Sequence, residues 1–419
     1  MSHSDLQRVA IIGGMRTPFV KAGMEFSKVS PLALSAHAVQ GLIERLSLNP
    51  EMIDDLVWGR VIHDPRLTNL AREIVFKLEL PASIRAHLVS NNCISGIHAL
   101  VAVADSIALG RADTGIAGGV ESMSNPPILF GRQASSLFLE VARTRDNSQK
   151  LKTLCKLRLR HFYPESLSVR EASTGLSMGE HAEVSAKEWQ IGRQEQDEIA
   201  MRSHLRAAAA TEDGRLGREI VPLQGIAKDT IIRPGTSMDK LAQLTPVFDR
   251  SAQGTITAGN ASQLTDGAAA VALMSEERAN RQGYEPLAFI KAVEFAGIHP
   301  DDGLLMAPCV AVPRLLAKTG LTLEDMDIVE VHEAFGAQVA CNLAAWEKGW
   351  KEPAIGRVDP ERLNPMGSSI AVGHPFAATG ARIVTTLANE LQRRKAKYGL
   401  VSICAAGAMA AAMILERPV

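Results

Sequence analysis

Two cysteines and two histidines of this 419-residue chain stand in settings that could support nucleophilic chemistry. Cys93 lies in the run SNNCISG, where an extended segment passes into a helix. Helix N-termini present free backbone N–H groups and a positive dipole, and both favour a thiolate and anionic intermediates. The sequence therefore predicts Cys93 as a nucleophile; a buried, inert cysteine is the alternative.

His374 is the candidate base for that thiol. Small residues precede it in the run MGSSIAVGHP, and Pro375 occupies a natural first helical position just after it. An imidazole held at a helix start can accept the proton of a thiol and later hydrogen-bond a thioester oxygen. A lone histidine is as readily a core residue, so the prediction depends on the other clusters.

Two further clusters carry polar groups at the ends of expected strands. Cys404 is followed by the run AAGA, whose lack of bulk exposes backbone N–H groups that could hold an oxyanion. His332 and Glu333 end another expected strand, where open α/β sheets tend to bind ligands. The alternative for this pair is a helix cap or a salt-bridged pair.

Strands and helices alternate around these residues. The expected strands cover 9–12, 55–58, 83–90, 114–117, 326–331 and 399–404, and the expected helices cover 31–46, 94–109 and 376–391. Such alternation favours an α/β sheet built from right-handed crossover units and covered on both faces. In each half, a turn with a reactive residue opens a helix rich in small residues, and a strand follows about 25 to 30 residues later, which favours a duplicated fold.

The stretch 124–250 is more polar and basic than its flanks and reads as an insertion. Within 139–162, Lys and Arg residues alternate with leucines. We leave two interpretations open for this expected basic helix. It is either a solvated helix packed on the body, or a contact with an anion, a membrane surface or a partner.

Overall composition is that of a globular protein without a nucleic-acid signal. Charged residues make up 22% and apolar residues 46%, and the formal net charge is -1. The five cysteines are odd in number and lack CxxC or Cys/His metal spacing, which argues against a disulfide framework or a zinc site. The polar N-terminus leaves no room for a signal peptide, so we expect a cytoplasmic protein.

Five clusters in order resemble the thiolase family over nearly the whole chain, from Val9 to Leu415. They are NNCISG, GTITAGNASQLTDGAAA, HEAF, GHPFAATGAR and CAAGAMAAAMI. The HEAF and GHPFAATG forms and the basic insertion are most similar to the thiolase (β) subunits of fatty-acid oxidation complexes. The resemblance implies a duplicated, layered α-β-α-β-α fold with an inserted helical loop domain. Its parts would be 1–123 completed by 251–283, then 124–250, then 284–419.

The same resemblance implies an acetyl-CoA C-acyltransferase, a 3-ketoacyl-CoA thiolase of fatty-acid β-oxidation. Cys93 matches the acyl-accepting nucleophile and His374 its base. Cys404 matches the second acid/base thiol, which protonates the departing acetyl-CoA carbanion and later deprotonates CoA. His332 matches a position that organises an oxyanion site through a water. The backbone N–H groups of Cys93 and Ala406 match a second oxyanion hole.

Coenzyme A enters this scheme as a substrate, and the resemblance implies no permanently bound cofactor and no metal. Ser262 is the best match to a pantetheine contact, and Arg233 is the candidate for the nucleotide end, with an ordinary surface arginine as the alternative. Asn260 and Asp266 are expected to shape the loop. The family also implies a homodimer, and the 139–162 segment is the candidate contact for a hydratase/dehydrogenase α subunit or an anionic lipid surface.

The chain departs from the family pattern at three places. Ser177 stands where a histidine is common, which allows a wider pocket; CAAGA replaces CxGGG; and the stretch 363–366 differs from the usual approach to the histidine. Three alternative functions remain. They are an acetoacetyl-CoA thiolase working in the condensing direction, a decarboxylating condensing enzyme with two histidines, and a non-catalytic scaffold subunit.

Overall fold

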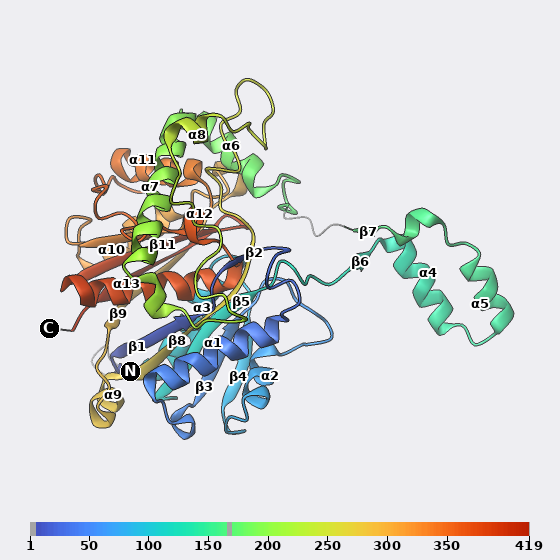
Figure 1. The fold of residues 1–419 in the computed structure, drawn as a ribbon, viewed down its shortest axis with the longest axis horizontal. Coiled ribbons are helices and arrows are strands. Elements are labelled where there is room, and N and C mark those ends of the chain that lie inside the picture. The colour runs from blue at the N-terminus through green and yellow to red at the C-terminus, as the bar shows by residue number, and fades with distance from the viewer. Residues whose placement is uncertain (1–5, 166–169, 419) are drawn as a thin grey trace.

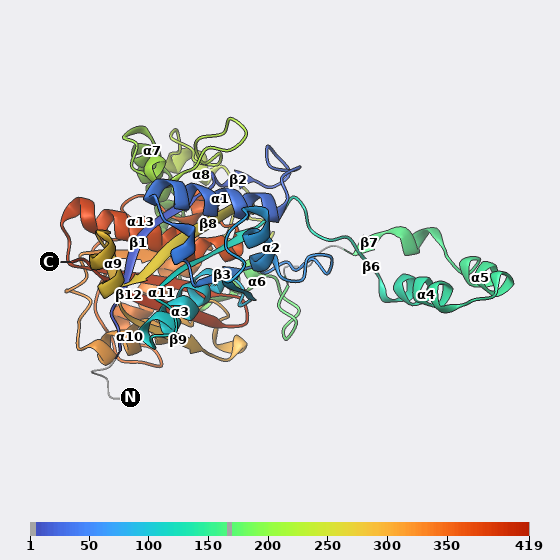
Figure 2. The same ribbon diagram turned by 90° about the horizontal axis from the view of Figure 1, so that it is seen from below.

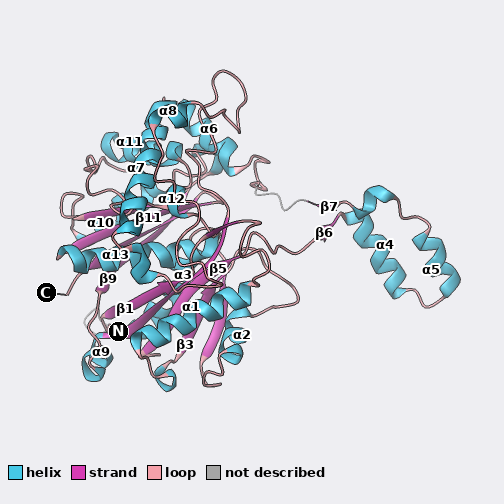
Figure 3. Cartoon of the chain, in the orientation of Figure 1, coloured by secondary structure: helices cyan, strands magenta, loops and turns pink. Residues whose placement is uncertain are grey.

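A ten-stranded mixed sheet forms the centre of the protein, which is described here by a computed structural model covering residues 6–165 and 170–418 (Figure 3). Its strands are β1 (Val9–Arg16), β2 (Val20–Lys21), β3 (Asp55–Gly59), β4 (Arg85–Val89), β5 (Thr114–Glu121), β8 (Thr265–Ser275), β9 (Ala288–Gly297), β10 (Ile328–Val331), β11 (Tyr398–Ala405) and β12 (Met409–Glu416). The order across the sheet is β10-β11-β12-β9-β1-β8-β5-β3-β4, and β2 pairs with β8.

Helices cover both faces of this sheet, and helices also lie between its two halves. The helices of the body are α1 (Pro31–Leu46), α2 (Leu70–Lys77), α3 (Ser95–Ala108), α6 (Met178–Glu188), α7 (Arg193–Glu212), α8 (Met238–Ala242), α9 (Glu276–Gln282), α10 (Pro308–Thr319), α11 (Gly336–Lys348), α12 (Ser369–Val372) and α13 (Thr379–Arg394). Helices α3 and α13 contact each other between the two halves, α1 and α2 cover one half, and α10 covers the other (Figure 1). The layered α-β-α-β-α arrangement expected from the sequence is confirmed.

The two halves repeat one pattern of pairing. In the first half β3 is parallel to β5, and β5, β8 and β1 follow in antiparallel order. In the second half β10 is parallel to β11, and β11, β12 and β9 follow in antiparallel order. Two residue pairs, Ala10 with Phe289 and Ile11 with Ala288, join β1 to β9 across the middle.

Fewer strand pairs are parallel than the sequence predicted. Among the described strands it is limited to β3 with β4, β3 with β5, and β10 with β11. The prediction of crossover units throughout is therefore wrong for the centre of the sheet. Strands β8 and β9 pair antiparallel with partners far away in the chain, and an alternating α/β pattern carries no information about such partners.

Two expected strand ends are also wrong. The first strand continues through Gly13 and Gly14 to Arg16, with a register shift between Ile11 and Gly13. A Cβ atom on Gly14 would lie 2.0 Å from the Thr385 hydroxyl oxygen, so glycine here admits α13 rather than a turn. Strand β5 likewise runs through its two glycines to Glu121.

Three apolar clusters hold the layers together. Leu100 of α3 and Val384 of α13 belong to the cluster between the halves. Val312 of α10 belongs to the outer cluster of the second half. Leu34 of α1 and Leu56 of β3 belong to the outer cluster of the first half. Each side chain that is fully buried in this way contributes about 1.5–3 kcal/mol, which fixes α3 and α13 against each other.

Residues 128–165, which we call the arm, leave the body between β5 and α6. The arm contains β6 (Leu129–Phe130), α4 (Arg132–Arg143), α5 (Asn147–Leu154), a 3-10 turn (Leu159–Phe162) and β7 (Pro164–Glu165). Figures 1 and 2 show it projecting away from the body. The interpretation of 139–162 as a helix packed on the body is therefore wrong. Thr144 and Asp146 lie in extended conformation, and Asp146 caps α5 with its side chain, so the chain breaks into two helices there.

None of the helices within the described residues combines the length and the apolar character needed to cross a membrane.

Candidate active site

Cys93 lies in a tight turn between β4 and α3. Asn92, just before it, adopts a left-handed conformation with φ of 47°. The Ser95 hydroxyl donates to the Asn92 carbonyl oxygen at 2.7 Å and accepts from the Asn91 N–H at 2.8 Å. These two bonds close the turn, so the Cys93 side chain is held at the helix start that the sequence predicted.

His374 reaches the Cys93 sulfur from the other half of the molecule. Its Nε2 atom lies 3.2 Å from the Cys93 sulfur, and its Nδ1 atom lies 2.7 Å from the Thr379 hydroxyl. Gly373, with φ of 112°, lets the chain turn from α12 into this position. The His374 N–H donates to the Gln263 carbonyl oxygen at 3.3 Å, which anchors the turn to the loop before β8.

Two glycines allow α3 and α13 to approach closely enough for this contact. A Cβ atom on Gly96 would lie 2.5 Å from the Ala377 carbonyl oxygen. A Cβ atom on Gly380 would lie 2.7 Å from the Ile97 nitrogen. Both distances are below those that real Cβ atoms adopt, so any side chain here would push the two helix starts apart and separate Cys93 from His374.

Cys404 lies at the end of β11. It is 1% exposed, and burial together with the Cys93 thiol raises the pKa of its own thiol. In the loop that follows, Ala406 keeps a negative φ, whereas Gly407 and Ala408 adopt φ of 79° and 54°. The left-handed strain of the CAAGA variant falls on Ala408. The backbone N–H of Ala406 acts on the Cys93 thiol and lowers its pKa.

Two side chains fix the peptide group that follows Ala406. Asn92 Nδ2 donates to the Ala406 carbonyl oxygen at 2.9 Å, and Glu171 accepts from the Gly407 N–H at 2.8 Å. Sequence reasoning missed both residues. Asn92 stands beside the nucleophile and could have been suspected, whereas Glu171 lies in the segment returning from the arm and gives no sequence signal.

Burial leaves the central thiol and imidazole uncharged at rest. Packing around the sulfur raises the pKa of Cys93 to about 12, although the N–H groups of Ala406 and of Cys93 itself lower it. Burial, assisted by the charge of Arg382, lowers the pKa of His374 to about 3. The sequence predicted a helix start that favours thiolate, but desolvation outweighs the N–H groups. Proton transfer from Cys93 to His374 must therefore accompany attack on a substrate.

His332 lies beneath His374 at the end of β10. The two rings are 4.2 Å apart between centroids, and the His332 Nδ1 atom lies 2.8 Å from the Ser369 hydroxyl. Burial, His374 and Arg382 together lower the pKa of His332 well below its usual value. A ring nitrogen of His332 lies within 4.8 Å of both the Cys93 sulfur and a ring nitrogen of His374.

Glu333, the neighbour of His332, has a structural role. Its carboxylate accepts from the Ser203 hydroxyl at 2.6 Å, from Asn364 Nδ2 at 2.7 Å and from the Ile370 N–H at 3.2 Å. The last bond caps α12, as the alternative interpretation of this pair proposed. Asn364, from the stretch that departs from the family pattern, thus orients the end of β10.

The candidate coenzyme A contacts lie at different depths. Ser262 is partly exposed, and its N–H donates to the Ala334 carbonyl oxygen at 2.9 Å, so it lies beside the His332 loop. Arg233 is exposed on the loop after α7, where its N–H faces His204 at 3.3 Å. Asn260 is buried and bonds Asp197, which supports its predicted role in shaping the loop. Ser177 caps α6.

A metal ion could in principle use the same atoms. The Cys93 sulfur and one ring nitrogen each from His332 and His374 all lie within 4.8 Å of one another. Three such ligands suit zinc, which would need a fourth. An ion here would occupy the sulfur that acyl transfer needs free, so the two uses exclude each other.

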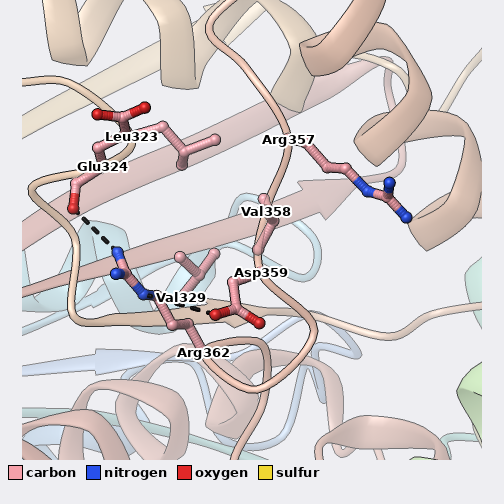
Figure 4. A pocket seen from close by; sticks show the side chains of 7 residues that line it. All are labelled: Leu323, Glu324, Val329, Arg357, Val358, Asp359 and Arg362. Carbon is pink, nitrogen blue, oxygen red and sulfur yellow. Dashed lines mark hydrogen bonds and ion pairs between the residues drawn. The ribbon is translucent and has the colours of Figure 1, made fainter.

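A surface pocket of about 450 Å³ lies away from these residues, beside β10 (Figure 4). It is lined by Leu323, Glu324, Val329, Arg357, Val358, Asp359 and Arg362. The Arg362 guanidinium already donates to the carbonyl oxygens of Glu324 and Met326 at 2.9 and 3.2 Å. Its donors are used within the protein, and the pocket holds none of the predicted site residues.

Comparisons with known proteins agree over the whole chain. The family descriptions "Thiolase, N-terminal domain" and "Thiolase, C-terminal domain" match residues 9–277 and 284–417. A 3-ketoacyl-CoA thiolase from Aeromonas salmonicida is 42% identical, and one from Colwellia psychrerythraea 40%, each alignment covering 98% of this chain and 97% of the relative.

Solved structures give the same result. Human mitochondrial 3-ketoacyl-CoA thiolase matches with a TM-score of 0.85 at 29% identity, covering 99% of this chain and 100% of that one, and it has also been solved in complex with CoA. The acetyl-CoA acetyltransferase of Bacillus anthracis matches with a TM-score of 0.86 at 31% identity over the same shares of the two chains.

Proposed function

The chain belongs to the thiolase family, and from that premise we propose that it is a 3-ketoacyl-CoA thiolase of fatty-acid β-oxidation, an acetyl-CoA C-acyltransferase. The observation that carries the proposal is the contact of 3.2 Å between His374 Nε2 and the Cys93 sulfur. A second buried thiol, Cys404, has its pKa raised by burial and by Cys93. Two acid/base thiols around one imidazole suit a reversible acyl transfer.

In the first half-reaction, the Cys93 sulfur attacks the 3-keto carbon while its proton passes to His374. The bond between the α and β carbons then breaks, and the electron pair leaves on the α carbon as the enolate of acetyl-CoA. Cys404 protonates that carbon. The N–H groups of Cys93 and Ala406 stabilise an oxyanion beside the sulfur, where charge develops.

In the second half-reaction, Cys404 takes the proton of the incoming CoA thiol. The CoA thiolate attacks the Cys93 acyl thioester, and the shortened acyl-CoA leaves. His374 returns its proton to Cys93, so the enzyme ends as it began. A covalent intermediate between two substrates gives ping-pong kinetics. No permanently bound cofactor takes part in this proposal, and CoA is a substrate.

We assign CoA to the space between the body and residues 124–250, with Ser262 at the pantetheine and Arg233 at the nucleotide end. The partly exposed position of Ser262 beside the His332 loop and the exposed guanidinium of Arg233 support this assignment. The proposal keeps 1–123 with 251–283 and 284–419 as the two core halves, and it places the enzyme in the cytoplasm.

The test is turnover of a graded series of 3-ketoacyl-CoA substrates with CoA, read as acetyl-CoA release. We expect the medium or long chains to react, and mass spectrometry should find the shortened acyl group on the Cys93 peptide. No release at any chain length would overturn the proposal. Turnover of acetoacetyl-CoA alone would identify the second candidate, an acetyl-CoA acetyltransferase, which the Bacillus anthracis match favours.

We further propose that the enzyme is a homodimer and that 139–162 of the arm contacts an anionic membrane surface. Between 130 and 163 the chain carries eight Lys or Arg residues and two acidic ones. Apolar side chains are exposed on the same arm, and Leu151 and Leu159 are 64% and 87% exposed. Basic charge mixed with exposed leucines is the pattern of a surface that lies on anionic lipid.

Sedimentation with phosphatidylcholine vesicles, with and without an anionic lipid, tests the arm. We expect the full chain to bind only the vesicles that contain the anionic lipid. The double variant Leu151→Ser/Leu159→Ser should reduce that binding about 10-fold. Lys291→Gln is the matched control, because Lys291 carries charge on the body. Binding to a hydratase/dehydrogenase α subunit without any vesicle binding would assign the arm to that partner. Light scattering tests the dimer.

A further inference from the structure

His332 is sealed from solvent, and one of its two ring nitrogens has a partner. The residue is 0% exposed, and its Nδ1 atom lies 2.8 Å from the Ser369 hydroxyl oxygen. Its Nε2 atom has no hydrogen-bond partner among the described residues. That nitrogen therefore remains available for a ligand beside Cys93 and His374.

Ser369 decides which ring nitrogen carries the proton. Arg382 Nη2 lies 2.9 Å from the Ser369 hydroxyl oxygen, and a guanidinium only donates. The hydroxyl oxygen must therefore accept from Arg382, which leaves the hydroxyl proton for His332 Nδ1. Nδ1 then accepts, and the ring proton of the neutral imidazole resides on Nε2.

The opposite tautomer would leave the Ser369 hydroxyl proton without an acceptor in this network. If Nδ1 carried the proton, the Ser369 oxygen would accept twice, and its own proton would face no acceptor in a fully buried site. In the Nε2–H tautomer the unpaired donor is Nε2–H, the atom that a substrate oxygen would meet, and Ser369 keeps a partner for both its oxygen and its proton. Arg382 itself is 1% exposed, and a guanidinium stays protonated even where burial lowers its pKa.

His374 lies in a different setting although its ring is only 4.2 Å away. Its Nδ1 atom faces the Thr379 hydroxyl at 2.7 Å, and His374 is the sole described partner of that hydroxyl. No cation forces the Thr379 oxygen to accept, so it can accept the Nδ1 proton. Nε2 of His374 is then free to receive the Cys93 proton at 3.2 Å.

We propose that Ser369, held by Arg382, is a positioning residue that fixes His332 as the Nε2–H tautomer, so that His332 donates a hydrogen bond to the substrate oxygen while His374 acts as the base. The donor role rests on the proposed function; the tautomer does not. Two adjacent histidines thereby take opposite roles, because Arg382 fixes the polarity of the Ser369 hydroxyl and no described cation does so at Thr379.

The direct test is the nitrogen-15 spectrum of histidine-labelled full-length protein, with His332→Gln used to assign the signal. We expect wild-type His332 to show a bare Nδ1 and a protonated Nε2. Ser369→Ala should give a mixture of tautomers, and Ser369→Thr should restore the single one. Ser368→Ala is the matched control, since the Ser368 hydroxyl lies 3.5 Å from Arg382 and bonds no histidine. It should leave the spectrum unchanged.

Kinetics supply the second readout. Ser369→Ala should lower kcat for 3-ketoacyl-CoA cleavage on the order of 10-fold with little change in KM, because a hydrogen bond made in the transition state is weakened. Ser369→Thr should recover the rate, and Ser368→Ala should stay within about twofold of the wild type.

The two proposals fail in different ways. A proton on Nδ1 of wild-type His332, or a Ser369→Ala spectrum identical to the wild type, overturns the positioning role whatever the activity. The expected tautomer in a protein that cleaves no 3-ketoacyl-CoA overturns the proposed function and supports the positioning of His332 by Ser369. A variant that fails to fold leaves the wild-type spectrum as the deciding measurement.

Discussion

The active site and the arm follow opposite rules of burial. Around Cys93, polar groups are buried, and the Nδ1 atoms of His374 and His332 each face a hydroxyl. In the arm, apolar side chains face solvent, and Leu159 is 87% exposed. Exposed leucines contribute nothing to folding stability, since burial is the source of that free energy. The site is organised by contacts within the protein, whereas the arm leaves apolar side chains without such contacts.

The two regions meet at one residue. Glu171 lies in the segment that returns from the arm, and its carboxylate accepts from the Gly407 N–H at 2.8 Å. The backbone N–H of Ala406, one residue earlier, lowers the pKa of the Cys93 thiol. Experiments can therefore locate the boundary between the two regions. Substitutions should affect catalysis as far as Glu171 and should no longer do so in the helices of the arm.

Replacing a cysteine by alanine in each of the two regions should give the largest difference in turnover. Cys93→Ala removes the nucleophile, and we expect turnover to fall by roughly 10⁴-fold or more, with no acyl group bound to the protein. Cys155→Ala changes an exposed cysteine of the arm and should leave turnover unchanged. Steady-state assays of the two variants check this, with thermal melting as the control for folding.

Equal losses in both cysteine variants would contradict the division between site and arm. Retained turnover in Cys93→Ala would remove Cys93 as the nucleophile.

Cys404→Ala should separate two steps within the site. Cleavage of 3-ketoacyl-CoA needs an acid for a departing carbanion, and we expect it to fall by about 10²- to 10⁴-fold. Acylation of Cys93 by an ordinary acyl-CoA releases a thiolate, which is a far weaker base, so that reaction should persist. Mass spectrometry of the Cys93 peptide and acetyl-CoA release measure the two steps. Parallel losses would show that Cys404 supports Cys93 and is not the acid.

At the boundary, Glu171→Ala should have a moderate effect. Losing the acceptor for the Gly407 N–H loosens the loop that carries the Ala406 donor, and one hydrogen bond of about 1 kcal/mol predicts a kcat lower by roughly fivefold. Glu171→Gln keeps an acceptor and should recover part of the rate. Glu140→Ala is the control, because Glu140 pairs with Thr153 and Lys156 inside the arm. A larger loss in Glu140→Ala would move the boundary into the arm.

Much of the fold and the reactive residues could be predicted from sequence because the relevant signals are local. The helix 31–46 agrees with α1, whose Ser30 cap and Pro31 are visible in the sequence. Cys93, His374 and Cys404 stand at element ends, where small residues precede or follow them. The structure brings these three together with His332 and Ala406.

The remainder depends on contacts that local patterns do not encode. Strand β9 pairs with β1 and β12, and both partners lie far from it in the chain. The arm has the pattern of leucines and basic residues that a packed helix would have. That pattern does not reveal that the arm projects from the body (Figures 1 and 2). Glu171 and Ser369 act through single hydrogen bonds to residues 236 and 37 positions away.

The pH dependence should show the smallest change and report most directly on burial in the site. The pKa of His374 is lowered to about 3, so the base stays unprotonated as pH falls from 8 to 5. We expect kcat/KM for 3-ketoacyl-CoA to vary by less than about twofold over that range, whereas a histidine with pKa 6.5 would lose about 30-fold at pH 5. In a ping-pong reaction this parameter reports the first half-reaction alone, so the ionisation of CoA does not enter it. An acid limb with a midpoint between pH 6 and 7 would mean that water reaches His374 and that its pKa is close to the ordinary value. The site would then be less closed than its hydrogen bonds indicate.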